Sequence, residues 1–218
     1  MAGTITALKI QKRNKNRVNV YLDERYAFSL ISHLAVPLHR GQILDDDDIA
    51  RLQEKDEYYK AYERITKFIA HRPRSETEVR RRMERQGVSP DLAERIIERL
   101  CTLRLLNDAE FARLWVENRE TFRPRGRHML RYELRQKGLS EKIIEEALEQ
   151  VDEEEGAHRL ALQQGERLAC LDRSTFRQKL MGYLVRRGYS YELARHAVSE
   201  SWQSLAKSDD NYQESEEK

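Results

Sequence analysis

Three short stretches decide the fold of this chain: MERQGVS at residues 83–89, LRQKGLS at 134–140 and VRRGYS at 185–190. Their glycines, Gly87, Gly138 and Gly188, are spaced 51 and 50 residues apart. Apolar residues stand eight and four places before each glycine, as Val79 and Met83 do, and a serine stands two places after it. The pattern predicts a helix that ends at the glycine in a left-handed C-cap, and a next helix whose N-cap is the serine.

A further helical stretch lies upstream of each glycine-centred pair: YYKAYERITKFIAH, NDAEFARLWVENRE and EEEGAHRLALQQGERLA. Each unit is therefore expected to contain three helices, and a repeat of this length is typical of helical-repeat proteins. The sequence predicts three such units at residues 58–106, 107–151 and 152–203, called repeats 1, 2 and 3 below. Positions in a repeat are counted from its glycine, so that Met83 is position −4 of repeat 1.

An Arg-Pro-Arg motif precedes the second helix of two repeats, as RPRS at residues 72–75 and RPRG at 123–126. Its first arginine is at position −15, and Arg173 keeps that position in repeat 3 without the proline or the second arginine. Proline is tolerated at a helix start, so the motif is expected to be the loop between the first and second helices. If the units are alike, the three arginines at −15 should point the same way, but the change in repeat 3 leaves open that the units contact a partner differently.

The segment before the repeats has a different periodicity. TALKIQ, RVNVYLD and YAFSLI alternate polar and apolar residues, which predicts a small antiparallel β-meander. QILDDDDIARLQEK follows as a helix capped by one of its aspartates, and residues 1–57 form an N-terminal domain. The aspartate run is not expected to bind a metal, because consecutive side chains on a helix point in different directions. Residues 204–218 are polar and acidic and are expected to be a disordered tail.

The predicted fold is therefore mainly α: an elongated array of three tandem three-helix repeats preceded by a small N-terminal β-meander. Charged residues make up 36% of the 218-residue chain, which suits a fold with much surface. No stretch approaches the 18 apolar residues of a membrane helix, and no apolar run resembles a signal peptide. With two cysteines and no CxxC motif, we expect a cytoplasmic protein that spans no membrane.

Basic charge recurs at the second helix of each repeat. Residues 72–86 hold six arginines against three glutamates, 123–137 six basic residues against one glutamate, and 173–187 five basic residues and no acid. Fourteen of the basic side chains are predicted to bind a partner protein or DNA: Arg72, Arg74, Arg81, Arg123, Arg125, Arg127, Arg131, Arg135, Lys137, Arg173, Arg177, Lys179, Arg186 and Arg187.

Two interpretations of this charge compete. Arginine is a good helix former, and each helix taken alone could be a solvated face held by salt bridges. Three copies in the same register, two of them nearly without acids, favour a basic stripe that meets a polyanion or an acidic protein surface.

The sequence carries no recognisable catalytic or cofactor motif. The six histidines form no HExxH or Cys/His cluster, and the chain has no GxGxxG, GxxxxGK[ST] or GxSxG motif. Phe111 and Trp115, four residues apart, are expected to belong to the core of repeat 2 instead of forming a base-stacking platform. The sequence therefore predicts a protein that is not an enzyme and has no cofactor or metal.

Several stretches resemble the RecX family of bacterial recombination regulators. LRLLNDAEFARLWVENR with RPRGRHMLRYELRQKGLSEKIIEEAL resembles the central part of that family, and SETEVRRRMERQGVS its first repeat. ITALKIQKRNKNRVNVYLDERYAFSL and RGQILDDDDIARL resemble the N-terminal extension of its longer members. The resemblance spans residues 5–203 and implies three tandem three-helix repeats.

The resemblance further implies a non-enzymatic protein that binds the RecA filament on DNA. Such a protein would lodge in the helical groove of the filament and inhibit ATP hydrolysis, strand exchange and co-protease activity. The expected partners are the RecA filament and DNA, single- or double-stranded and without sequence preference, and the chain is expected to act as a monomer.

The alternative is a nucleic-acid-binding helical-repeat protein that acts without RecA, with its second helices used as recognition helices. Base-reading side chains are sparse in those segments, where Gln86, Gln136 and Gln178 stand alone, and this argues against sequence-specific readout.

Overall fold

The computed structural model describes residues 2–216, with side chains described as far as Leu205. This part of the chain contains ten helices and four strands, which confirms the mainly α fold class. The chain divides into two compact units. Residues 1–73 and 79–106 form unit 1, and residues 74–78 and 107–218 form unit 2.

Unit 1 begins with a four-stranded antiparallel sheet in the order β3-β2-β1-β4. Its strands are β1 (Gly3–Ile10), β2 (Arg17–Leu22), β3 (Arg25–Ile31) and β4 (Ile43–Leu44). Asp23 and Glu24 join β2 to β3 with φ angles of 45° and 65°, the left-handed conformation that a tight hairpin turn requires. Val18, Val20 and Leu22 alternate into the core of the unit, so the predicted meander is confirmed.

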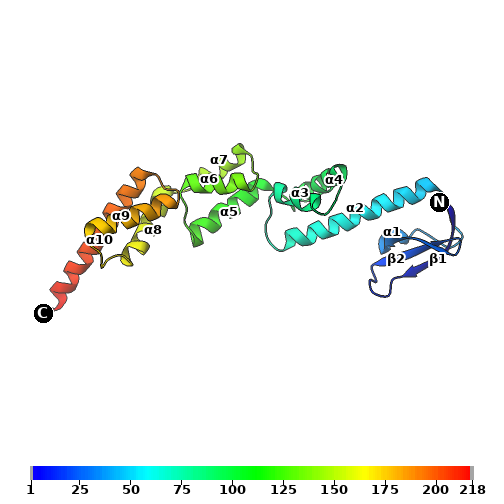
Figure 1. The fold of residues 1–218 in the computed structure, drawn as a ribbon, viewed down its shortest axis with the longest axis horizontal. Coiled ribbons are helices and arrows are strands. Elements are labelled where there is room, and N and C mark those ends of the chain that lie inside the picture. The colour runs from blue at the N-terminus through cyan, green and yellow to red at the C-terminus, as the bar shows by residue number, and fades with distance from the viewer. Residues whose placement is uncertain (1, 217–218) are drawn as a thin grey trace. The chain divides into compact units, whose positions relative to one another are not determined.

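The short helix α1 (Ser32–Ala35) and strand β4 lead into a single long helix, α2 (Asp46–Ala70). Figure 1 shows that α2 is not interrupted. Asp45 and Asp48 form a capping box at its start, so the aspartate run is a helix cap as predicted. The two helices predicted before and after residues 57 and 58 are one helix, so the predicted domain boundary falls inside α2. No glycine, proline or new cap interrupts residues 46–70, so the two predicted helices propagate as one.

The two halves of α2 serve different cores within unit 1. Ile49 and Leu52 pack on the sheet, whereas Ala61 and Ile65 are buried in the core of repeat 1. Between the halves lies Asp56, a buried carboxylate whose residue is 3% exposed. The sheet and repeat 1 therefore share one helix and meet at a charged residue.

The Asp56 carboxylate has three partners. It accepts hydrogen bonds from the Arg17 guanidinium (3.0 and 3.2 Å) and from the Ile31 N–H (2.7 Å), and it pairs with Lys60 at 2.6 Å. Burial by itself would raise the pKa of Asp56, but the hydrogen bonds from Arg17, Lys60 and Ile31 outweigh it and hold the pKa below its ordinary value.

A fragment of residues 58–203 is still expected to fold, although it begins inside α2. The core of repeat 1 uses α2 from Tyr58 onward, and Ile65 is fully buried there. The fragment loses the cap at Asp45, so its first turn should fray. Far-ultraviolet circular dichroism should show a cooperative helical melt; a spectrum without helical minima would show that the sheet is required.

Eight further helices, α3 to α10, complete the three repeats. The bounds are α3 (Glu76–Glu84), α4 (Pro90–Thr102), α5 (Asp108–Phe122), α6 (Arg127–Gln136), α7 (Glu141–Leu148), α8 (Glu153–Glu166), α9 (Arg173–Arg186) and α10 (Tyr191–Glu216). Each repeat has its own apolar core, and the residues at positions −8 and −4 are fully buried in all three. The register therefore marks the inner face of each second helix.

The glycine turns have the predicted geometry. Gly87, Gly138 and Gly188 have φ angles of 72°, 79° and 93°, where a side chain would strain the backbone. In each turn the N–H at position +1 donates to the carbonyl at −4, at 3.1 to 3.3 Å, which closes a Schellman-type C-cap. The serine at +2 accepts a hydrogen bond from the N–H three residues later. The same sequence pattern therefore produces the same helix C-cap, turn and helix N-cap in all three repeats.

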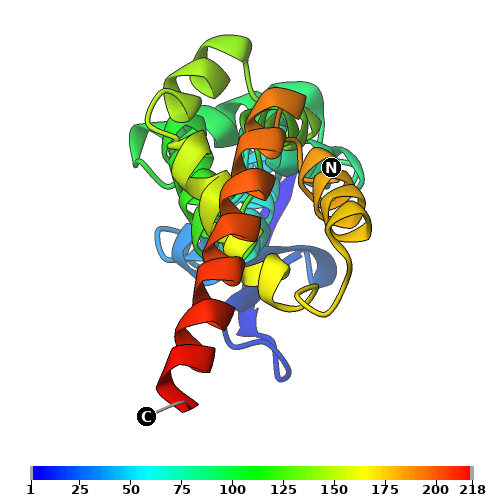
Figure 2. The same ribbon diagram turned by 90° about the vertical axis from the view of Figure 1, so that its left-hand side faces the viewer.

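Helix α10 extends further than expected. Figure 2 shows it as one long helix, and its bounds include residues 204–216, which the sequence predicts to be disordered. A packed helix needs no new nucleus to continue, and alanine, lysine, glutamine and glutamate in this segment favour helix. Residues 217–218 of that predicted tail lie outside the described residues.

Candidate anion-binding surface

The residue after the Arg-Pro-Arg motif, at position −12, makes a joint with a glycine turn of unit 2. Ser75 donates its hydroxyl hydrogen bond to the Lys137 carbonyl at 2.7 Å. Gly126 makes the equivalent contact, because its N–H donates to the Arg187 carbonyl at 3.0 Å. In both cases position −12 binds position −1 of the following repeat. The motif therefore shapes a turn that docks on the next glycine turn.

In repeat 3, position −12 has a different residue and a different role. Phe176 stands there and is fully buried in the core of its own repeat. Without the proline, α9 begins at Arg173, whereas α3 begins at Glu76 and α6 at Arg127, both at position −11. Helix α9 is thus one turn longer at its start. The units are therefore not alike at position −15, since Arg173 is helical and Arg72 and Arg123 are not.

Arginines of the second helices in repeats 1 and 2 pair with acids of the third helices. Arg80 at position −7 forms a two-pronged salt bridge with Glu94 at +7, at 2.5 and 3.1 Å. Arg131 and Glu145 occupy the same two positions in repeat 2 and pair at 2.7 to 3.0 Å. Both pairs join the second helix to the third across the glycine turn. The basic charge at −7 is therefore neutralised inside repeats 1 and 2.

Other predicted site residues of repeat 2 are also engaged. Arg135 pairs with Glu141 at 2.8 Å. The Arg127 guanidinium donates to the Val151 carbonyl at 2.7 Å, and its backbone N–H donates to Glu153 at 3.0 Å. The acid-poor setting expected for these arginines is wrong, because the acids come from α7 and the start of α8.

A half-buried network surrounds Glu133 on α6. Its carboxylate accepts hydrogen bonds from the Trp115 indole at 2.8 Å and from Arg119 at 2.7 Å, and Arg125 lies 3.8 Å away. Lys137 pairs with Glu78 at 2.9 Å. Phe111 is buried and Trp115 packs against the same core, so their predicted core role is confirmed. Arg125 and Lys137 are thus parts of the packing of unit 2.

Among the fourteen predicted site residues, most of those with no ion pair in the described part of the chain lie in repeat 3. Arg173, Arg177, Lys179 and Arg186 are exposed, and within residues 2–205 none of them makes an ion pair or a side-chain hydrogen bond. Arg187 is half-buried, donates to the Tyr183 hydroxyl at 2.9 Å and lies over its ring. In the remaining repeats, Arg72, Arg81 and Arg123 are exposed and Arg74 is half-buried. The predicted stripe is therefore uneven and strongest in repeat 3.

Counting charge on second helices alone missed Arg195, which lies on α10. Position +7 holds glutamate in repeats 1 and 2 but Arg195 in repeat 3, and position −7 holds Met181 in place of arginine. Comparing the three repeats as far as seven residues after each glycine reveals this change of charge in the sequence. Arg195 is exposed and, like its neighbours on α9, has no acidic partner within residues 2–205.

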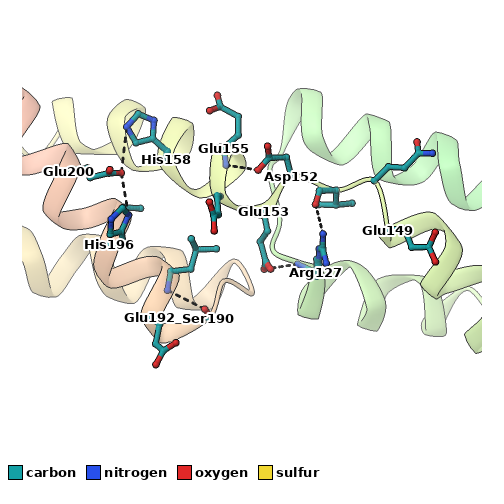
Figure 3. A pocket seen from close by; sticks show the side chains of 15 residues that line it. Arg127, Glu149, Asp152, Glu153, Glu155, His158, Ser190, Glu192, His196 and Glu200 are labelled. Carbon is teal, nitrogen blue, oxygen red and sulfur yellow. Dashed lines mark hydrogen bonds and ion pairs between the residues drawn. The ribbon is translucent and has the colours of Figure 1, made fainter.

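A large acidic cavity, about 1070 Å³ in volume, lies between repeats 2 and 3. Seven of its lining side chains are carboxylates: Glu149, Asp152, Glu153, Glu154, Glu155, Glu192 and Glu200. Figure 3 shows His158 and His196 reaching Glu200, at 3.9 and 3.5 Å. No group of His, Cys, Asp or Glu side chains in the described residues is arranged to hold a metal ion. None of the described helices is long and apolar enough to cross a bilayer.

The paired arginine at −7 and the unpaired arginines of repeat 3 should behave differently on mutation. Arg131→Ala is expected to weaken partner binding by less than twofold, because its charge is already neutralised, and to shift the unfolding midpoint by no more than about 2 °C. Arg177→Ala should weaken binding several-fold at unchanged stability. Binding titrations with thermal melts of both variants test this, and equal losses would contradict it.

Family models match the chain in four consecutive parts. The regulatory protein RecX N-terminal domain matches residues 3–45, and the first, second and third three-helix domains of RecX match residues 61–100, 107–148 and 152–198. These matches follow the sheet and the three repeats in chain order.

Curated relatives and solved structures agree with the family models. The regulatory protein RecX of Bacillus subtilis is 33% identical over 202 residues, covering 90% of this chain and 76% of the relative. That of Clostridium perfringens is 30% identical over 203 residues, covering 90% and 95%. A crystal structure of regulatory protein RecX superposes with a TM-score of 0.71 at 27% identity, covering 91% of this chain and 99% of that one. RecX from Lactobacillus salivarius gives a TM-score of 0.61 and 23% identity over 67% of this chain and 97% of that one, which supports the fold.

Three glycine-capped three-helix modules preceded by a small sheet define a tandem helical-repeat protein. Each of its parts matches a RecX domain, and the relatives over most of its length carry the name of a regulatory protein. The chain belongs to the RecX family. The resemblance noted in the sequence is confirmed, and the role that the family name supports is regulation.

Proposed function

We propose that this chain regulates the RecA recombinase by binding the RecA filament on DNA in its helical groove. Bound there, it inhibits ATP hydrolysis, strand exchange and co-protease activity. The observation that carries the proposal is the match to RecX domains from residue 3 to residue 198. The protein acts as a cytoplasmic monomer and meets the DNA of the filament without reading its sequence.

The repeated joint supports this mode of binding. Within unit 2, the Ser75 hydroxyl donates to the Lys137 carbonyl and the Gly126 N–H donates to the Arg187 carbonyl, and the second contact joins repeats 2 and 3. A helical polymer presents the same surface at regular intervals. Several weak contacts held on one scaffold add through their effective concentration, so no single tight site is required.

The test is the ATPase rate of RecA on single-stranded DNA as the purified protein is titrated in. We expect the rate to fall steadily and to reach less than half of its initial value. The same titration with the Arg173→Ala, Arg177→Ala, Arg195→Ala triple variant should require several-fold more protein. An unchanged ATPase rate at protein concentrations that saturate binding would overturn inhibition as the mode of regulation.

A second candidate is a nucleic-acid-binding protein that acts without RecA. The unpaired cations of repeat 3 favour it, because unneutralised arginines gain most from phosphate contacts. Binding to naked DNA and to RecA-coated DNA at equal salt separates the two candidates. Tight binding to naked duplex with no preference for the coated strand would favour the second.

A further inference from the structure

Repeat 3 contains a pocket of about 640 Å³ between the start of α9 and the middle of α10. Arg173 and Arg177, four residues apart on one face of α9, line one side, and Arg195 lines the other. Phe176 forms the buried floor, and the ring of Trp202 packs edge-on against it at 5.0 Å. Three cations thus surround an aromatic wall within one concave site.

Several departures of repeat 3 from the common register build this pocket. The extra turn of α9, present because the proline is missing, adds Arg173 to the helix. The change from glutamate to arginine at position +7 supplies Arg195, and methionine at −7 removes the competing internal pair. Position −12, which forms the joint at Ser75 and Gly126, here supplies Phe176 as the floor. Positions that make structural contacts in repeats 1 and 2 therefore contribute to a site in repeat 3.

Two acids that lie next to pocket-lining residues in the sequence, Asp172 and Glu200, have partners of their own. Asp172 caps α9, because its carboxylate accepts hydrogen bonds from the N–H groups of Ser174 and Thr175 at 3.0 and 3.1 Å. Glu200 lies 3.5 Å from His196. None of the described residues that line the pocket is acidic, and the other polar side chains among them are Ser174, His196, Ser199 and Gln203. The site has hydrogen-bond donors and positive charge for an anion.

We propose that this pocket binds a nucleotide, with the phosphate held by Arg173, Arg177 and Arg195 and the base placed against Trp202. Guanidinium groups match the geometry of phosphate oxygens, and an aromatic side chain offers a stacking surface to any base. The nucleotide is either free or one unit of a single strand, since both present the same chemistry.

A nucleotide suits the pocket better than an acidic peptide does. A volume of about 640 Å³ lies in the range of small-molecule pockets, whereas a single carboxylate would leave most of it empty. A carboxylate would also leave the ring of Trp202 without a planar partner. The cations and the aromatic wall together therefore select for a ligand that is charged at one end and flat at the other.

The inference goes beyond regulation of RecA and does not depend on it. It concerns a contact that the protein makes alone, so it is tested without RecA. Loss of RecA inhibition with intact nucleotide binding, or the reverse, would separate the failure of one proposal from the failure of the other.

The test uses fluorescence of the full chain carrying Trp115→Phe. The chain has two tryptophans, so Trp202 becomes the one reporter. Adenosine 5′-monophosphate and a short oligodeoxyadenylate are titrated in parallel, with poly-glutamate as the acidic peptide control. Arg195→Glu, which installs the residue of the other repeats, should weaken nucleotide binding roughly tenfold, as loss of a phosphate or stacking contact does.

Lys142→Glu is the matched control, because it makes the same charge change at a side chain of α7 that is 86% exposed. It should alter nucleotide affinity less than twofold, and melts of both variants should match the parent. Quenching by both ligands identifies a site for free nucleotides, and quenching by the oligomer alone identifies a single-strand site; either supports the proposal. No quenching, equal losses in the two variants, or poly-glutamate binding with the same dependence on Arg195 would overturn it.

Discussion

Replacing Asp56 with alanine is expected to lower the free energy of unfolding of unit 1 by about 3–5 kcal/mol, the usual cost of breaking a buried ion pair from one side. The Asp56 side chain is 4% exposed and that of Arg17 is 14% exposed. Alanine would leave the guanidinium next to Ser29 without its carboxylate and the Ile31 N–H without an acceptor. The loss arises from these orphaned groups more than from the charge attraction itself.

The measurement can be confined to the affected unit. Trp115 and Trp202, the two tryptophans, both belong to unit 2, so tryptophan fluorescence follows that unit, while hydrogen exchange of the amides of β2 and β3 follows unit 1. Exchange should accelerate in Asp56→Ala, and the fluorescence transition should stay in place. Glu57→Ala is the matched control, because it removes the same charge from the next, exposed position of α2. A comparable loss in the control would show that helix charge is responsible and not the buried pair.

The same pair predicts a pH dependence. The pKa of Asp56 is below its ordinary value of 3.8 in the folded protein, so its stabilisation is fully present above the unfolded-state pKa. It is lost as the pH falls through the folded pKa. The stability gap between the parent and Asp56→Ala should therefore stay constant from neutral pH to about pH 4 and close at lower pH. Urea unfolding at a series of pH values, followed by exchange or circular dichroism, measures this gap.

The helices and turns around the three glycines could be predicted from the sequence because the residues that determine them lie close together in the chain. Apolar positions at −8 and −4, a left-handed glycine and a serine cap determine a helix, a turn and a helix within about twenty residues. The continuity of α2 was not readable in the same way. Its two halves face different cores, so its apolar residues lie on no single stripe, and the chain appeared to hold two helices.

The candidate site was predicted less well because charge pairing is not local. Arg131 looks free when α6 is taken alone, and its partner Glu145 lies on the next helix. The Arg-Pro-Arg motif suggested a binding loop, whereas its neighbours Ser75 and Gly126 bind glycine turns that lie 62 residues and 61 residues further along the chain. Contacts at that separation leave no mark in helical periodicity. The change from glutamate to arginine at Arg195 is visible when the repeats are aligned on their glycines. It lies, however, outside the second-helix segments, where the basic charge is concentrated.

Replacing Gly126 with alanine is expected to destabilise the joint between repeats 2 and 3 by about 3 kcal/mol, the upper part of the range for overpacking. A Cβ atom at Gly126 would collide with the Gly188 carbonyl oxygen and lie 2.6 Å from the Tyr189 nitrogen. Those atoms are backbone and belong to a turn that already holds Gly188 at a φ of 93°. No rotamer change can relieve the contact, so the turn must move away and the Gly126 N–H must leave the Arg187 carbonyl.

Gly182→Ala tests whether the effect belongs to the joint. Its Cβ would meet only the end of the flexible Arg186 side chain, at 3.1 Å, and alanine is the better residue inside a helix such as α9. This variant should be neutral or slightly more stable. In Gly126→Ala, hydrogen exchange should accelerate first at residues 126–130 and 187–190, ahead of the buried helices of repeats 2 and 3, because each repeat keeps its own apolar core. If exchange at the joint stays slow while global stability falls, the cost lies in the cores. The backbone contact between Gly126 and Arg187 would then not be what holds repeats 2 and 3 together.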